Sequence, residues 1–519
     1  MKKRNIIYAM FAACVGMTTT VSCSSDYLDT TPEKEASPNL IFSTADGAKL
    51  AINGLSKLMT QQYMSQLFNG EGSIKTLYGN FQGNEYQRPV IVAGLEAIVN
   101  GSHLRNSSVN YDYYPWFYYY RIIGNANTVI KRIDGASGDA NQKKFIKAQA
   151  LTFRAYCYSM LVQLYCKRWM DSGNGESDGV VLRLDESKGA MSLSTLAACY
   201  KQIYDDLDEA ITLYGESGLD RVATDNHLPN INAAYAVYAR AAIDREDWSS
   251  AAKYAALARK GYPLMTNEEY CSGFNTKNSE WIWSVYGDAS ETLSFYQFFA
   301  YEGSNSSSTW CRSRPAAISK ELFDKIPTSD IRRSLFLDPA GDSYDGDGGK
   351  AGDELRLRAK KDYASRLYST TAIFAFMQMK NLAKVQPGVG EFSLFRSAEM
   401  YLIEAEADCH LGNDEGARKL LLELNNASGR DTEYSCTKSG DELLEEVRLY
   451  NRIELWGEGH DWFNYKRWGL PIERHSSKDG GSFLPQFAVT LKPSDNEGWT
   501  WIIPTKETDY NPALFGNDK

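Results

Sequence analysis

The chain has 519 residues, a formal net charge of −10 at pH 7 and an isoelectric point near 5.3. An acidic composition without a clustered basic face excludes the electrostatic footprint of nucleic-acid-binding proteins, so we expect no nucleic-acid partner. A chain of this length exceeds what a single hydrophobic core usually serves.

The first 22 residues are typical of a bacterial lipoprotein signal peptide. Residues 2–4 are basic, and the apolar stretch 6–15 is too short to span a bilayer. Small residues at 20–22 directly precede Cys23, so we predict that Cys23 is the first mature residue and carries acyl chains. Each buried methylene contributes about 0.8 kcal/mol, so several chains hold a protein on a membrane. An ordinary secretory signal that is cleaved near a cysteine is the alternative.

The polar, acidic segment 23–37 is predicted to be a flexible tether outside the packed domain, which we expect to span 38–519. No stretch after the signal approaches 18 apolar residues. Acylation of Cys23 is therefore the only membrane attachment that the sequence predicts.

Four segments before residue 220 are predicted to be helices, and the second and fourth are amphipathic. They are 38–62, 111–134, 144–169 and 194–214. The third carries a seam of small residues from Ala148 to Ser159, which allows a neighbouring helix to approach closely.

Two later segments share a helix–turn–helix layout, at 232–260 and at 397–425. Both have alanines where their two helices would meet. Repeats of about 34 residues with this layout are tetratricopeptide-like. Two units so far apart in the sequence are too few to predict an uninterrupted solenoid.

The helical pattern breaks between these units, from about residue 266 to residue 387. Residues 280–285 alternate like a strand, and the rest is rich in Gly, Ser, Asp and aromatic residues. Trp281 and Trp283 are interpreted as packing residues. Loops of this kind carry function on a helical scaffold.

Several motifs in the C-terminal third resemble, in their order, those of the SusD/RagB family of surface glycan-binding lipoproteins of Bacteroidota. They are FRSAEMYLIEAEA at 395–407, RIELWGEGHDWF at 452–463, KRW at 466–468 and IPTKETDYNP at 503–512. At the front, CSSDYLDTTP at 23–32 and the helix that ends at Trp169 fit as well. The resemblance therefore involves both ends of the chain and its middle helices.

The resemblance implies a mainly α fold, with tetratricopeptide-like helix–turn–helix units forming a right-handed helical scaffold and with few short strands. The scaffold would comprise 38–265 and 388–519, and the loop-rich, irregular insertion 266–387 would bear the ligand face. Trp116, Tyr119 and Tyr120 match a helix that packs against this scaffold in the family.

The resemblance further implies a lipid-anchored protein of the outer membrane that faces the cell surface. Its partner would be a TonB-dependent, SusC-like transporter, to which it would deliver captured oligosaccharide or polysaccharide. The family carries no catalytic activity. A surface receptor for peptide or glycoprotein fragments on the same scaffold is the alternative, since relatives of this fold need not all bind sugar.

Glu454 and Glu458 are the residues that most resemble an enzyme site. They lie one helical turn apart, with about 6 Å between their Cβ atoms, which is close to the carboxylate separation of a retaining glycosidase. Two acids on one helix approach a sugar from the same side, however, and Arg452, His460 and Arg467 are near enough in the sequence to neutralise them. We therefore interpret the pair as part of a structural ion network.

The loop 343–354 partly matches a twelve-residue calcium loop, with Asp at positions 3 and 5, Gly at 6 and Glu at 12. Position 1 is Ser343, and no helix pattern clearly flanks the loop on both sides. We interpret it as a solvated acidic loop and predict no metal and no cofactor. The seven cysteines after Cys23 show no metal-ligand spacing and are expected to be mostly free.

The candidate ligand contacts are aromatic residues within polar, Gly-rich stretches, where a regular core is not expected. One group is Tyr78, Phe81 and Tyr86, with Asn80, Asn84 and Arg88 as hydrogen-bond donors to ring hydroxyls. The other group is Tyr296, Tyr301 and Trp310, beside the run Gly303 to Thr309. Both stretches fall where the family usually builds its ligand face, and Trp310 is the foremost candidate.

Overall fold

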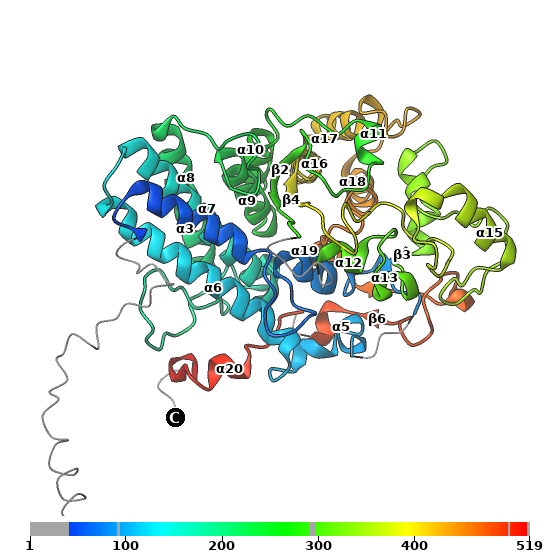
Figure 1. The fold of residues 1–519 in the computed structure, drawn as a ribbon, viewed down its shortest axis with the longest axis horizontal. Coiled ribbons are helices and arrows are strands. Elements are labelled where there is room, and N and C mark those ends of the chain that lie inside the picture. The colour runs from blue at the N-terminus through cyan, green and yellow to red at the C-terminus, as the bar shows by residue number, and fades with distance from the viewer. Residues whose placement is uncertain (1–40, 91–93, 290–296, 497–498, 516–519) are drawn as a thin grey trace, which may run out of the picture.

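The protein, described by a computed structural model, is mainly helical, which confirms the predicted fold class (Figure 1). The structure describes residues 41–90, 94–289, 297–496 and 499–515. Cys23, the signal peptide and the tether lie outside the described residues. The longer helices are α3 (Ala45–Leu58), α6 (Asn110–Arg132), α7 (Ala140–Tyr165), α8 (Leu196–Ser217), α9 (Ile231–Asp244), α10 (Trp248–Ala258), α15 (Asp353–Asp362), α16 (Ser397–His410), α17 (Asp414–Leu422), α18 (Gly440–Glu454) and α19 (Asp461–Trp468). The short helices are α4 (Gly70–Ser73), α5 (Glu96–Val99), α11 (Asn267–Tyr270), α12 (Phe298–Glu302), α13 (Thr309–Ser313), α14 (Lys320–Phe323) and α20 (Thr505–Thr508), and a π-helix (Ile74–Asn80) continues α4.

The strands of the described chain form two-stranded antiparallel pairs. The pairs are β1 (Tyr86–Gln87) with β3 (Ala317–Ile318), β2 (Trp281–Val285) with β4 (Phe392–Arg396), and β5 (Ile472–Glu473) with β6 (Thr490–Leu491). The strand predicted at 280–285 is therefore confirmed as β2. Both faces of β2 are buried, because all five of its residues are buried. Trp281 and Trp283 enter two separate apolar clusters.

Capping residues set the ends of the predicted helices. The side chain of Asp139 accepts a hydrogen bond from the backbone N–H of Gln142, so α7 begins at Ala140 rather than at the predicted residue 144. Gly218 ends α8 in the left-handed conformation, with φ of 62°, which glycine adopts without steric cost.

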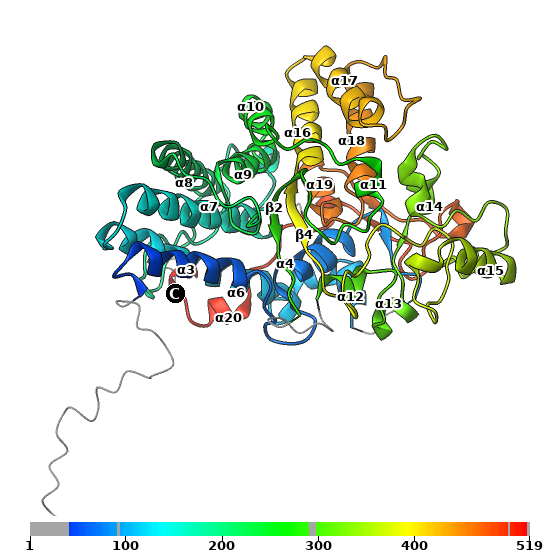
Figure 2. The same ribbon diagram turned by 45° about the horizontal axis from the view of Figure 1, so that its top comes forward.

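The long helices form one continuous row, in which each helix packs on the next: α6, α7, α8, α9, α10, α16 and then α17 and α18 (Figure 2). The two helix–turn–helix units are α9–α10 and α16–α17, and α10 packs directly on α16. Their separation in the sequence had predicted scattered units, and the structure differs on this point. The intervening residues leave the row after α10 and return through the paired strands β2 and β4.

The aromatic residues of α6 face the scaffold, as predicted. Trp116 is 2% exposed, and its ring meets the edge of Tyr165 at 5.0 Å between centroids. Tyr119 is fully buried, while Tyr120 is partly exposed and donates its hydroxyl to the carbonyl of Val181. These rings contribute to the core rather than to a surface.

A network of buried ions joins the returning strand β4 to the end of α18. Arg396 forms ion pairs with Glu280 (2.8 Å), Glu454 (2.7 Å) and Glu458 (2.7 Å). Lys380 forms a further pair with Glu458 at 2.6 Å. The interpretation of Glu454 and Glu458 as members of a structural ion network is therefore confirmed. The predicted partners are wrong, because Arg452 pairs with Glu85 and Arg467 with Glu406.

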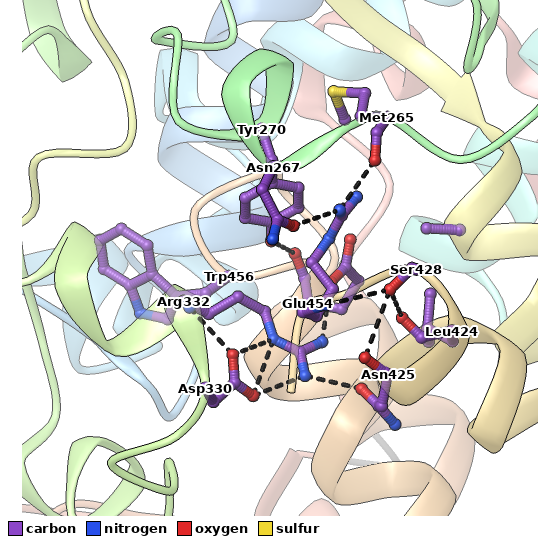
Figure 3. A network of polar contacts seen from close by, with 12 residues as sticks. Met265, Asn267, Tyr270, Asp330, Arg332, Leu424, Asn425, Ser428, Glu454 and Trp456 are labelled. Atoms are coloured by element: carbon purple, nitrogen blue, oxygen red, sulfur yellow. Dashed lines mark hydrogen bonds and ion pairs between the residues drawn. The ribbon is translucent and has the colours of Figure 1, made fainter. Parts of the chain in front are cut away.

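Arg332 extends the network toward the insertion (Figure 3). Its guanidinium binds Asp330 at 2.6 Å and the second oxygen of Glu454 at 2.8 Å, and it donates to the side-chain oxygen of Asn425 at 2.6 Å. Since Arg332 lies in the insertion and Asn425 follows α17, the network ties three distant parts of the chain together. Each of the three charged side chains is at most 1% exposed.

Electrostatics in the network favour ionised carboxylates. Burial alone would raise the pKa of Glu454, but Arg396, Arg332 and other cations lower it to about 2. Burial also raises the pKa of Glu458, but the cations Arg396 and Lys380 lower it to about 2. A carboxylate with a lowered pKa stabilises the fold above its unfolded pKa of about 4.5, and this contribution is lost as the pH falls toward 2.

We expect the substitution Glu454→Gln to lower the free energy of unfolding by about 3–5 kcal/mol, because it leaves Arg396 and Arg332 buried with too little negative charge. It should also reduce the loss of stability between about pH 4.5 and pH 2. Urea unfolding at several pH values measures both effects.

The matched control is Glu445→Gln on the same helix, since Glu445 is 60% exposed and, among the residues that the structure describes, pairs only with Arg448. It should change the free energy of unfolding by less than about 0.5 kcal/mol. Equal effects of the two substitutions would contradict a structural role of the buried network.

Candidate ligand-binding face

Trp310 is the second residue of the short helix α13, which is held in place by the turn before it. The helices α12 and α13 are joined by the polar turn 303–308, and Ser308 begins α13 by accepting a hydrogen bond from the backbone N–H of Cys311 at 3.2 Å. The serines and asparagine of this turn make such bonds with little bulk, which is why the sequence there lacks an apolar period.

The turn 303–308 is bound to a second segment of the insertion. The backbone N–H of Ser304 donates to the carbonyl of Asn381 at 3.0 Å, and the side chain of Asn305 donates to the carbonyl of Ala383 at 3.0 Å. A turn held at several points keeps the aromatic residues on either side of it in fixed positions.

Trp310 and Tyr301, two of the predicted contacts, lie side by side. Their ring centroids are 5.0 Å apart, with an interplanar angle of 72°, and both side chains are partly exposed. The guanidinium carbon of Arg314 lies 5.3 Å from the Trp310 ring. The indole N–H of Trp310 is buried and has no acceptor within the described part of the chain. This arrangement leaves part of the ring, rather than its polar edge, for a ligand.

The first predicted group of contacts is buried, so its assignment as ligand contacts is wrong for five of six residues. They are Tyr78, Asn80, Phe81, Tyr86 and Arg88, none more than 9% exposed. Asn84 is partly exposed, but its amide is occupied by Glu85 and by the backbone N–H of Glu473. Tyr296 lies outside the described residues, and its ligand contact stays a prediction.

The glycines of the stretch 76–88 give it the composition of a loop, but they serve close packing. A Cβ atom at Gly79 would lie 2.1 Å from the carbonyl oxygen of Gly459, and one at Gly83 would lie 2.3 Å from the carboxylate of Asp461. The glycines allow the backbone to pack closely against the segment 457–461. Asn80 stabilises this contact with two hydrogen bonds: its side-chain N–H donates to the carbonyl of Gly457, and its side-chain oxygen accepts from the backbone N–H of Gly459.

Arg88 links the two predicted groups. Its guanidinium carbon lies 4.9 Å from the Phe81 ring and 5.9 Å from the Trp310 ring, and it donates to the backbone carbonyls of Tyr301 and Arg314. The two stretches chosen from the sequence therefore meet in space, with the first supporting the second from within.

Three further residues of this face were missed by sequence reasoning. Arg312 and Arg314 lie two and four residues beyond Trp310 and could have been found from that spacing. Tyr368 is 38% exposed, and the guanidinium carbon of Arg312 lies 5.5 Å from its ring. No local sequence pattern indicated that Tyr368 belongs to this face, because it comes from a different part of the insertion.

The loop 343–354 folds as a hairpin. The carbonyl of Ser343 accepts from the backbone N–H of Gly352 at 2.9 Å, and the carboxylate of Asp347 accepts from the backbone N–H of Ser477 at 2.8 Å. Within the described ranges, no group of three or more His, Cys, Asp and Glu side chains could hold a metal ion. The seven cysteines that the structure describes are all free thiols.

Family comparisons agree with this architecture. Residues 26–243 match a family model described as "Starch-binding associating with outer membrane", and residues 265–517 match the model of the SusD family. The two matches together span the helical row, the insertion and the ion network. The chain belongs to the SusD family. SusD-like proteins bind carbohydrate and are not catalytic, which agrees with the structural role of Glu454 at the end of α18 and of Glu458 in the turn that follows.

Individual relatives are distant in sequence but similar over their whole length. A SusD-like protein of Formosa agariphila is 23% identical, over 100% of this chain and 99% of its own. The solved structure of a SusD-like carbohydrate-binding protein from Bacteroides vulgatus has a TM-score of 0.75 at 22% identity, covering 91% of this chain and 98% of its own. That of a SusD superfamily protein from Bacteroides thetaiotaomicron has a TM-score of 0.72 at 23% identity, covering 91% and 99%.

Association with the outer membrane is part of the description of the family. Among the residues that the structure places, no helix combines the length and the apolar character that crossing a bilayer requires.

We expect Phe81→Ala to lower the free energy of unfolding by about 3–5 kcal/mol, because Phe81 is 2% exposed and stacks on Tyr86 at 5.4 Å. Tyr368→Ala should lower the free energy of unfolding much less, since the Tyr368 side chain is 38% exposed. Urea unfolding of both variants checks the prediction. A Phe81→Ala variant as stable as the native protein would contradict the burial of Phe81.

Proposed function

We propose that this SusD-family protein is a cell-surface lipoprotein that captures glycan and delivers it to a TonB-dependent, SusC-like transporter of the outer membrane. The observation that supports it best is the pair Trp310 and Tyr301, two partly exposed rings that a polar turn holds in place on a starch-binding family fold. A sugar ring has an apolar C–H face that stacks on such a ring, and its hydroxyls bond the polar groups around it.

The expected affinity is weak. A sugar face that hides ~60 Å² of apolar surface contributes about 1.5 kcal/mol at ~25 cal/mol/Å². Two or three stacked rings with a few net hydrogen bonds sum to roughly 4–6 kcal/mol, which corresponds to a Kd between about a millimolar and tens of micromolar. Weak capture suits a protein that hands its ligand on, and a long glycan that meets many anchored copies gains avidity.

Trp310→Ala should weaken glycan binding five- to thirty-fold, about 1–2 kcal/mol, because it removes the stacking platform. Its cost in folding free energy should stay below the about 3–5 kcal/mol of a fully buried aromatic residue, since Trp310 is partly exposed. Calorimetric titration with the glycan and thermal unfolding measure the two effects.

Trp116→Ala is the matched control, because it truncates the same side chain within the core. It should lose folding stability and leave the glycan affinity of the folded fraction unchanged. A Trp310→Ala variant that melts early while its folded fraction binds normally would refute the role of Trp310. Tight binding of peptides with no binding of any glycan would favour the alternative receptor function.

The membrane anchor is proposed from the sequence alone. Cys23→Ser should yield a folded protein that is neither acylated nor retained in the outer-membrane fraction, because the acyl chains supply the attachment. Metabolic labelling with a fatty acid and membrane fractionation test this expectation. Unchanged fractionation of the variant would overturn the lipoprotein assignment.

A further inference from the structure

Two long stretches of the insertion contain no carboxylate. Residues 303–320 carry Arg312, Arg314 and Lys320, and residues 363–390 carry three further cations, all without any Asp or Glu. The chain as a whole has 66 acidic residues in 519, roughly one in eight, so these 46 positions would on average hold about six. Acid-free stretches also occur on the helices at 113–133 and 140–170, so what distinguishes the two stretches of the insertion is their place beside Trp310.

The two acid-free stretches lie against each other beside Trp310. The carbonyl of Arg312 accepts from the backbone N–H of Ala372 at 2.7 Å, and its guanidinium donates to the hydroxyl of Thr370 at 2.9 Å. The turn 303–308 is bound to Asn381 and Ala383, as described above. The folded chain thus brings the two stretches into contact beside Trp310, although residues 315–319 and 373–381 are buried.

Several of these cations are already neutralised or enclosed. Lys380 is buried and paired with Glu458, and Lys320 pairs with Asp324. Arg366 donates to the backbone carbonyls of Met379 and Cys271. Each of these cations is therefore already engaged by a partner within the protein.

Three cations remain without an acidic partner in the described part of the chain: Arg312, Arg314 and Lys384. The guanidinium of Arg312 donates to neutral oxygens, namely the carbonyl of Ser307 and the hydroxyls of Thr309 and Thr370. Arg314 makes no hydrogen bond through its guanidinium within the described ranges, although it lies 5.3 Å from the Trp310 ring. Lys384 is exposed. We call Trp310, Arg312, Arg314, Tyr368 and Lys384 the cationic face.

We propose that the cationic face selects anionic saccharides, whose sugar units carry carboxylate or sulfate groups. This inference rests on the proposed function and assigns a substrate class to the same site. A sugar that stacks on the open part of the Trp310 ring places its substituents beside Arg314, whose planar fork binds carboxylate or sulfate oxygens in pairs. Arg312 and Lys384 add positive potential along the rest of the face.

The test compares ligands that differ only in charge: dextran sulfate with dextran, and polygalacturonate with its fully methyl-esterified form. We expect the charged member of at least one pair to bind about ten-fold more tightly in 50 mM NaCl. The preference should shrink in 500 mM NaCl, because the Arg314 side chain is partly exposed and salt screens such charges. A preference for dextran sulfate over dextran identifies sulfate as the recognised group. A preference for polygalacturonate over its methyl ester identifies carboxylate.

Arg314→Gln should weaken binding of the charged ligand about ten-fold and so remove this preference, while the melting temperature changes little, because the Arg314 side chain is partly exposed. Arg121→Gln is the matched control, because Arg121 also lies over aromatic rings, at 5.7 Å from Tyr63 and 6.0 Å from Phe117, on the distant helix α6. It should keep the preference. Loss of the preference in Arg121→Gln instead of Arg314→Gln would overturn the assignment.

The remaining outcomes separate this inference from the proposed function. Equal binding of charged and neutral ligands would overturn the charge selectivity and leave glycan capture intact. Failure of every glycan to bind, with the protein folded, would refute glycan capture itself and the selectivity with it.

Discussion

Arg396 is buried at the point where the insertion returns to the helical row. It forms ion pairs with three carboxylates that come from different segments of the chain. Glu280 comes from the residue before β2, Glu454 from the end of α18, and Glu458 from the turn that follows. A buried ion without such partners costs several kcal/mol, so the network is satisfied only when all these segments are in place. It thereby couples the position of the insertion to that of the scaffold.

This coupling has a direct consequence for the ligand-binding face. Lys380, which pairs with Glu458, lies in the same acid-free stretch as the segment that holds the turn beside Trp310. Arg88 fixes the opposite side, because it bonds the backbone on both sides of α13. The partly exposed rings of Tyr301 and Trp310 lie on the short helices α12 and α13, whose positions are fixed by contacts to these buried charges, and this keeps the rings preorganised for a weak ligand.

The division of the molecule follows the same logic. The row of helices from α6 to α18 is built from close helix contacts, which tolerate little variation, whereas the insertion carries polar turns on its outside. A family that keeps the row and varies the insertion can change its ligand without changing its fold, because function resides in the site rather than in the architecture. Here the insertion contains two stretches, 303–320 and 363–390, that lack Asp and Glu.

The sequence by itself determined the features that depend on near neighbours. Helical periodicity located the helices, alternation located β2, and the spacing of Glu454 and Glu458 indicated a shared ion network. Only the tertiary structure decided which aromatic residues reach the surface. The stretch around Phe81 has the composition of a loop, but its glycines serve close backbone packing, and composition cannot distinguish these two uses. Tyr368 and Lys384 join Trp310 through contacts between segments more than 50 residues apart, and no local pattern encodes such contacts.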